Sequence, residues 1–135
     1  MSERDFELFN NSLERCMQDG DFLHRFYDLF LGSSDVVAKK FEHTDFLKQT
    51  RLLGKSLYVM MVPSDDPDLA LRLERLARRH SRADLDIKPE LYDLWLEKLV
   101  QAAGEFDPMF DAETETAWRR VLRPGIEYMK SRYET

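Results

Sequence analysis

The sequence predicts an all-α protein, and three observations support this class. Apolar residues recur at three- and four-residue spacing through nearly the whole chain, which is the period of an amphipathic helix. Alternating runs of β-branched residues, the usual sign of strands, are almost absent. Glycine and proline number only five each, so the segments between the periodic stretches are short and neighbouring helices pack closely.

The first third of the chain predicts two helices and a short third one. The first covers residues 2–18, because Ser2 and Asp5 have the spacing of an N-cap and its partner. The second covers 22–32 and carries Tyr27 on an aromatic face, and a short stretch follows at 35–40. The breaks and connections are Gly20, Gly32-Ser33-Ser34 and Glu42-His43-Thr44.

Four longer helices complete the prediction. Their expected ranges are 45–62, 67–80, 89–104 and 111–133. Pro63 to Asp66 should close the first of them, and Pro67 stands at a first helical position. Asp111 is the expected cap of the last helix, within which Pro124-Gly125 predicts a local kink or weakening. A polar loop at 81–88 and a turn at 106–108 separate the later helices.

Length and charge limit the function classes. With 135 residues and 16.0 kDa, the chain is expected to be one domain, 1–135. The 20 basic and 26 acidic residues give a net charge of −6, which argues against nucleic acid and anionic lipid as partners. The longest apolar run has six residues, Leu57 to Val62, against about 20 for a membrane span. The lone Cys16 and the absence of a visible signal peptide predict a cytoplasmic location.

Three polar residues stand where the helical period demands apolar ones. Gln49 lies within an apolar stripe, His80 ends another, and Tyr27 shares a face with phenylalanines. The stripes are Phe46, Gln49, Thr50, Leu53, Leu57, Met60 and Met61, and Leu69, Leu73, Leu76, Ala77 and His80. Burying an amide without a partner costs about 1–3 kcal/mol. Each residue is therefore either bonded to backbone or at the stripe edge, or it faces a cavity, where His80 could be a metal ligand.

Other combinations of residues carry no recognisable chemistry. Zinc spacing, a glycine-rich phosphate loop and a nucleophile motif are all absent from the sequence. His24 is expected at the solvated surface, whereas His43 is in a loop that could edge a pocket. Trp95 and Trp118 are read as core or interface anchors rather than as parts of a site.

In chain order, these residues resemble a bacterial single-domain globin, similar to the haem domain of flavohaemoglobins. Phe26-Tyr27 through Phe41, Thr44-Asp45-Phe46 and Gln49 look like the distal half of that family. Leu76 to His80, followed by Ile87-Lys88-Pro89-Glu90-Leu91-Tyr92, looks like its proximal half, and Trp118 also matches. The resemblance covers about residues 6–133.

This resemblance implies a globin fold with helices in two layers around a pocket for haem b. His80 would be the proximal iron ligand, and Tyr27 and Gln49 would donate hydrogen bonds to a bound diatomic gas. Phe41 would pack on the porphyrin, and Arg79 or Arg51 could pair with a propionate. The residues expected to contact the cofactor are Tyr27, Phe41, Gln49, Leu53, Leu76, His80, Ile87 and Tyr92.

The implied function is reversible binding of O2, with NO and CO as further ligands. NO dioxygenation with an external reductase, gas sensing, or a haem-free interaction role remain alternatives, so the enzyme class stays open. In flavohaemoglobins a glutamate and a tyrosine orient the proximal histidine; Tyr92 matches the tyrosine, but the glutamate's place falls near Tyr133. Association of two copies around Trp95 and Trp118 is also left open.

Overall fold

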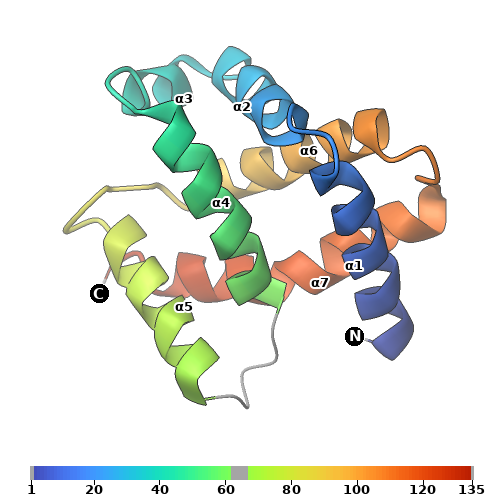
Figure 1. Cartoon of the computed structure of the whole chain (residues 1–135). Coiled ribbons are helices and arrows are strands. Elements are labelled where there is room, and N and C mark those ends of the chain that lie inside the picture. Colours follow the sequence, from blue (N-terminus) through green and yellow to red (C-terminus); the bar gives the residue numbers. More distant parts are fainter. Residues whose placement is uncertain (1, 62–66, 135) are drawn as a thin grey trace.

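The chain forms seven α-helices within residues 2–61 and 67–134, the parts that the computed structural model describes (Figure 1). No strand occurs within those ranges, so the all-α class is confirmed. Each described helix end lies within two residues of its predicted position, while Val62 and the predicted cap at Pro63–Asp66 lie outside the description. The helices are α1 Glu3–Met17, α2 Phe22–Gly32, α3 Asp35–Lys40, α4 Phe46–Met61, α5 Pro67–His80, α6 Glu90–Phe106 and α7 Ala112–Ser131.

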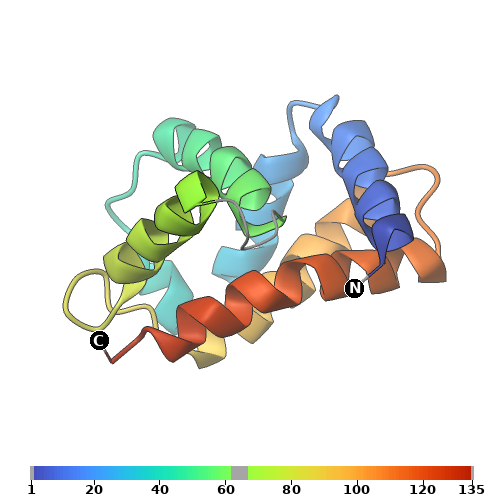
Figure 2. The same cartoon turned by 90° about the horizontal axis from the view of Figure 1, so that it is seen from below.

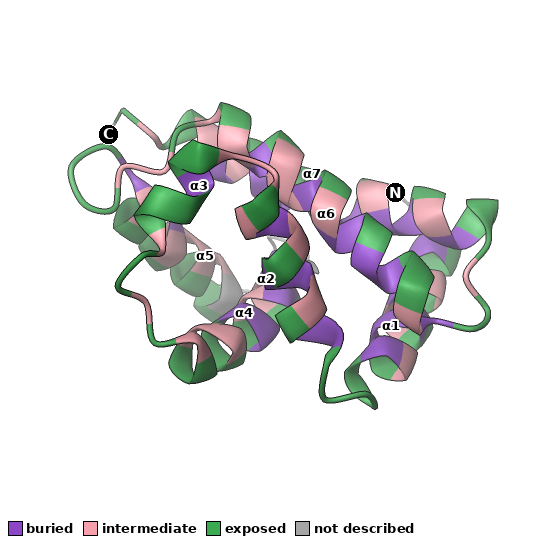
Figure 3. Cartoon of the chain, turned by 90° about the horizontal axis from the view of Figure 1, so that it is seen from above, coloured by how far each residue is buried: buried purple, intermediate pink, exposed green. Residues whose placement is uncertain are grey.

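The helices are arranged in two layers. The two C-terminal helices α6 and α7 pack against each other and lie along one side of the molecule (Figure 2). Helices α1, α4 and α5 pack against α7, and α2 packs against α6. The buried residues fall on the faces that the helices turn towards one another (Figure 3). In the described ranges, no helix combines the length and apolar character needed to cross a membrane.

Caps fix several helix starts where the sequence predicts them. The Ser2 hydroxyl accepts a hydrogen bond from the Asp5 amide at 3.1 Å, and the Asp5 carboxylate accepts one from the Ser2 amide at 3.3 Å. Asp111 accepts from the Thr114 amide at 2.8 Å and starts α7. Asp45 precedes α4 and accepts from the first amides of that helix. Such caps satisfy amides that have no partner within the helix.

A buried polar network ties the N-terminal helix to the C-terminal pair. The Trp118 indole N–H donates to Ser12 Oγ at 2.9 Å, and the Ser12 hydroxyl donates to Asp107 at 2.6 Å. Arg15 donates two further hydrogen bonds to Asp107, at 2.6 and 3.0 Å. Every buried polar atom of this network has a hydrogen-bond partner. The network therefore positions α1 without leaving a buried polar group unsatisfied.

Helix α7 runs without interruption past Pro124, which lacks the amide hydrogen of a normal helical residue. The next residue, Gly125, allows α4 to approach closely, since a Cβ added there would lie 3.1 Å from the Met60 Cβ. This contact brings the C-terminal half of α4 onto α7 and helps to set the spacing beneath the central cavity. The side chains of Met61 and Leu69 lie outside the description.

Candidate functional site

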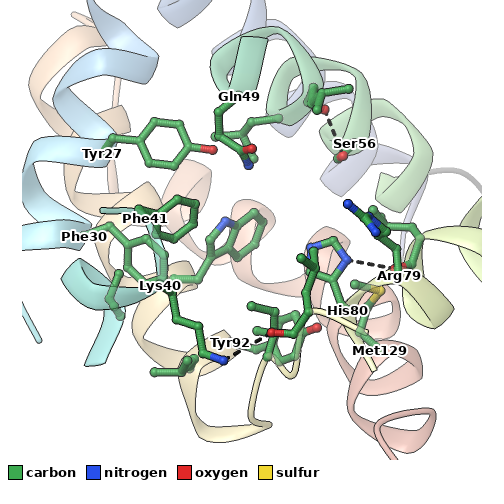
Figure 4. Close-up of a pocket in the computed structure, with 18 of the residues that line it drawn as sticks. Tyr27, Phe30, Lys40, Phe41, Gln49, Ser56, Arg79, His80, Tyr92 and Met129 are labelled. Carbon is green, nitrogen blue, oxygen red and sulfur yellow. Dashed lines mark hydrogen bonds between the residues drawn. The ribbon is translucent and has the colours of Figure 1, made fainter. Parts of the chain in front are cut away.

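A cavity of about 450 Å³ lies among α2, α3, α4, α5, α6 and α7 (Figure 4). This volume is within the usual range for sites that bind small molecules and cofactors. The eight residues that the sequence analysis expects to contact the cofactor all line this cavity: Tyr27, Phe41, Gln49, Leu53, Leu76, His80, Ile87 and Tyr92. These eight side chains come from α2, α4, α5, α6 and the connections after α3 and α5, and they are up to 65 positions apart in the sequence.

His80 is the last residue of α5 and presents a neutral imidazole to the cavity. Its Nδ1 lies 2.8 Å from the carbonyl oxygen of Leu76, one turn earlier. Because a carbonyl only accepts, Nδ1 carries the proton and donates it, which leaves the lone pair on Nε2. Burial lowers the pKa of His80 below its usual value, and the nearby Arg79 acts in the same direction. Nε2 is therefore an unprotonated nitrogen facing the open space (Figure 4).

The loop after His80 is held by contacts that the sequence does not reveal. The Ile87 amide donates to the His80 carbonyl at 3.0 Å, and the Asp86 amide donates to Ser81 at 2.9 Å. Asp86 has a φ of 54°, a left-handed conformation that aspartate tolerates better than most residues. The Tyr133 hydroxyl donates to the Asp86 carboxylate, which ties the C-terminal end to this loop. These contacts fix the backbone on which His80 is presented.

Tyr27 and Gln49 lie on the side of the cavity opposite His80 (Figure 4). The Tyr27 hydroxyl points towards the Gln49 side chain. Burial raises the pKa of Tyr27 to about 12, and the interaction with Gln49 only partly offsets that rise. The hydroxyl consequently keeps its proton near neutral pH and is available as a hydrogen-bond donor. The ring is held by aromatic contacts to Phe26, Phe41 and Phe46, with centroids 4.9, 5.8 and 5.4 Å away.

The walls between these two sides are mostly apolar. Leu53 on α4 is buried, and the half-buried Leu76 and Ile87 lie on the side of His80. Phe41 follows α3 and contacts Tyr27 and other aromatic rings of the cavity. Tyr92 on α6 is buried, and burial alone raises the pKa of its hydroxyl well above the usual range. Among the described residues, no carboxylate is hydrogen-bonded to that hydroxyl.

The mouth of the cavity combines two cations with exposed apolar side chains. Lys40 and Arg79 line it, and each also bonds to the loop after His80: Lys40 to the Leu85 carbonyl at 3.2 Å and Arg79 to Asp84 at 2.9 Å. Leu52 and Leu85 line the cavity yet are 47% and 40% exposed. Arg51, the other propionate partner considered from the sequence, is exposed and is not among the lining residues.

Both tryptophans pack in or against the core, and one of them also belongs to the cavity wall. Trp95 packs against the core, as expected, but it also lines the cavity and makes an edge contact with Phe26, which the sequence analysis did not expect. A signal existed, because Trp95 follows Tyr92 by three residues and shares its helical face. Trp118 has no exposed surface, so it is a core residue and cannot anchor an association of two copies.

The remaining histidines and several lining residues complete the comparison with the sequence. His24 is exposed, as expected, and His43 is also exposed and does not line the cavity. Ser56, Met60 and Met129 also line the cavity; the sequence analysis placed Met60 on an apolar stripe but assigned none of the three to the cofactor site. The place of Met129 depends on how α7 crosses the other helices, which no local pattern predicts.

Fold and site together define an all-helical protein whose pocket sets one neutral histidine opposite a tyrosine and a glutamine. The globin family profile matches residues 24–126, most of the chain, and the protein therefore belongs to the globin family. The crystal structure of PA3967 from Pseudomonas aeruginosa PAO1, described as structurally highly homologous to a human haemoglobin, superposes with a TM-score of 0.87. Its sequence is 38% identical, and the match covers 97% of this chain and 99% of that one.

A comparison with curated proteins gives no match. The family match and the structural relative confirm the globin fold and the resemblance to a bacterial single-domain globin.

Proposed function

We propose that this globin binds haem b in the central cavity, with His80 as the protein ligand to iron, and that it binds O2 reversibly. NO and CO are the further gas ligands of the proposal. The observation that carries it is the neutral His80 imidazole, whose Nδ1–H is engaged by Leu76 and whose Nε2 faces the cavity. In metalloproteins, a hydrogen bond from the ring nitrogen that does not bind the metal orients the histidine ligand in this way. Residues 1–135 are proposed to form one globin domain.

The residues of the cavity fit haem better than a bare metal ion. Among the described residues, no group of three or more His, Cys, Asp or Glu side chains could hold an ion, so His80 would be a lone protein ligand. A lone ligand suits an iron whose other positions are occupied by a macrocycle. The apolar walls suit a flat, largely apolar group, which would cover the exposed Leu52 and Leu85. Lys40 and Arg79 are suitably charged for its two carboxylates.

When bound, haem supplies an iron with one position open to a diatomic gas; the protein supplies the environment. Tyr27 can donate a hydrogen bond across the neutral pH range, because its hydroxyl keeps the proton. The Gln49 amide is a second donor on the same side. Each such bond contributes about 0.5–1.5 kcal/mol net and would slow release of a ligand that carries partial negative charge. Leu53 and Phe41 limit the space beside the two donors.

The hydrogen-bond partner of His80 favours reversible O2 binding over O2 activation. Nδ1 donates to a backbone carbonyl and not to a carboxylate, and carboxylate partners are the ones that most raise the basicity of a histidine ligand. The carboxylate of Asp86, which the sequence alone does not place here, is bonded to Tyr133 instead. NO dioxygenation with an external reductase, gas sensing and a haem-free role stay as alternatives.

The test is a haem titration of the purified protein followed by cycles of oxygenation. We expect uptake to saturate at one haem per chain, and the reduced protein to return to its starting spectrum after O2 is removed. A folded protein, verified by circular dichroism, that takes up no haem in a saturable manner would contradict the proposal. Rapid irreversible oxidation in every O2 cycle would contradict the reversible part of it.

A further inference from the structure

Positive charge is concentrated on two neighbouring helices of this acidic chain. Helices α4 and α5 together contain seven lysines and arginines but only two acidic residues, a net charge of +5. The whole chain carries −6, so everything outside these helices carries −11. The two helices pack against each other and lie side by side in Figure 2.

The charges form one stripe on each helix. Positions three and seven residues apart share one helical face, and three exposed cations have this spacing on α4 and three on α5. We call these six residues the basic rim: Lys48, Arg51, Lys55, Arg72, Arg75 and Arg79.

Within residues 2–61 and 67–134, five of the six rim side chains have no counter-ion. Only Arg79 forms an ion pair, with Asp84; within the described parts of the chain, the other five side chains have neither an ion pair nor a hydrogen bond. Elsewhere, exposed arginines are paired: Arg4 with Glu113 at 2.5 Å and Arg25 with Glu105 at 2.8 Å. Like charges on one face repel, so this arrangement does not help folding. Its physical consequence is a positive field along these two neighbouring helices.

The rim reaches the mouth of the cavity through Arg79. Arg79 belongs to the α5 stripe and also lines the cavity. On the same two helices, α4 contributes Leu52 and Ser56 to the lining, next in sequence to Arg51 and Lys55, and α5 contributes Leu76, next to Arg75. Leu52 is 47% exposed and Leu85 40%, so a small apolar patch lies at a mouth that Arg79 and Lys40 also line. A partner that covers this patch would come close to the edge of any group held in the cavity.

We propose that the basic rim is the docking surface for an acidic electron-transfer protein, which reduces the cofactor through the cavity mouth. This inference rests on the proposed haem binding. Each encounter would transfer one electron: the partner would be oxidised by one electron and would reduce bound ferric haem to the ferrous state that binds O2. Charge complementarity raises association rates more than affinity, which suits the small and transient interfaces of electron-transfer proteins.

A small acidic plant-type [2Fe–2S] ferredoxin is the probe. Stopped-flow absorption measures the rate at which reduced ferredoxin reduces the ferric holoprotein, and fluorescence anisotropy measures binding of labelled oxidised ferredoxin. The variant is Arg51→Gln/Arg72→Gln/Arg75→Gln. The control is Arg4→Gln/Arg25→Gln/Arg120→Gln, which changes the net charge equally on α1, α2 and α7.

At low ionic strength we expect ferredoxin to reduce the rim variant about tenfold more slowly than the wild type and to bind it more weakly. The reduction rate of the control variant should change less than twofold. About 1 M salt should remove the difference, because the Debye length is then roughly 3 Å. Photoreduced lumiflavin, a small neutral reductant, should reduce all three proteins equally fast.

Equal slowing of both triple variants would overturn the proposal, since net charge alone would then explain the effect. The proposal would also be overturned if reduced ferredoxin reduced the rim variant as fast as the wild type, while the variant had lost binding to anionic vesicles, to duplex DNA or to a second copy of this chain. The rim would then serve that other partner. A wild-type protein that takes up no haem is recognised from its spectrum before any ferredoxin is added, and that result contradicts the proposed function instead.

Discussion

Replacing Tyr27 by phenylalanine removes a single hydroxyl from the cavity and leaves the aromatic packing of the ring in place. The side chain is only 4% exposed, and its pKa of about 12 keeps the hydroxyl protonated. If this hydroxyl donates to bound O2, its loss costs about 0.5–1.5 kcal/mol, the net value of a neutral hydrogen bond. Since 1.4 kcal/mol corresponds to a factor of ten, O2 should dissociate roughly 2 to 12 times faster.

The assay is stopped-flow displacement of O2 by CO from the reduced holoprotein. Tyr58→Phe is the matched control, because it is the same chemical change on α4 at an exposed position that does not line the cavity. CO dissociation from Tyr27→Phe should change less, since bound CO carries less negative charge for a donor to stabilise. An unchanged O2 dissociation rate in Tyr27→Phe, or an equal change in Tyr58→Phe, would refute the role of this hydroxyl.

Two further predictions concern stability, measured by urea unfolding. Asp107→Ala should lower the free energy of unfolding by about 2–3 kcal/mol. This loss is smaller than that expected for breaking a fully buried ion pair, because the Arg15 side chain is partly exposed. Burial opposes ionisation of Asp107, but its hydrogen bonds hold the pKa below the usual value, so its contribution is present above about pH 4 and is lost below it. The gap between wild type and variant should therefore narrow in acid; a pH-independent gap would contradict this. Gly125→Ala should lose about 1 kcal/mol through its clash with Met60, whereas Gly104→Ala, with 3.5 Å to its nearest neighbour, should be neutral or stabilising. Equal effects of the two substitutions would argue against a close α4–α7 contact.

The helices were predictable because each one carries its own apolar period and most carry a cap. Ser2 and Asp111 cap their helices where the local spacing indicates. The site residues could be recognised because Tyr27, Gln49 and His80 are polar residues on apolar helix faces. A buried polar group needs a partner, so such residues point to a shared cavity, and the structure brings them into one. Their roles towards haem and gas remain proposals.

Features that depend on distant residues could not be predicted. The bond between Ser12 and Asp107 joins positions 95 residues apart, and neither residue stands out locally. The left-handed Asp86 and its bond from Tyr133 depend on where α7 ends relative to the loop after His80. Trp95 is a different case: its helical spacing from Tyr92 was visible in the sequence.

Ligation of iron by His80 is the central claim, and an absorption spectrum tests it most directly. The haem-reconstituted protein is reduced and exposed to CO, beside His80→Ala and the control His24→Ala, which changes an exposed histidine. We predict a strong Soret band that shifts with CO in wild type and control, and that is lost or displaced in His80→Ala. A His80→Ala protein with the wild-type spectrum in every state would contradict the account.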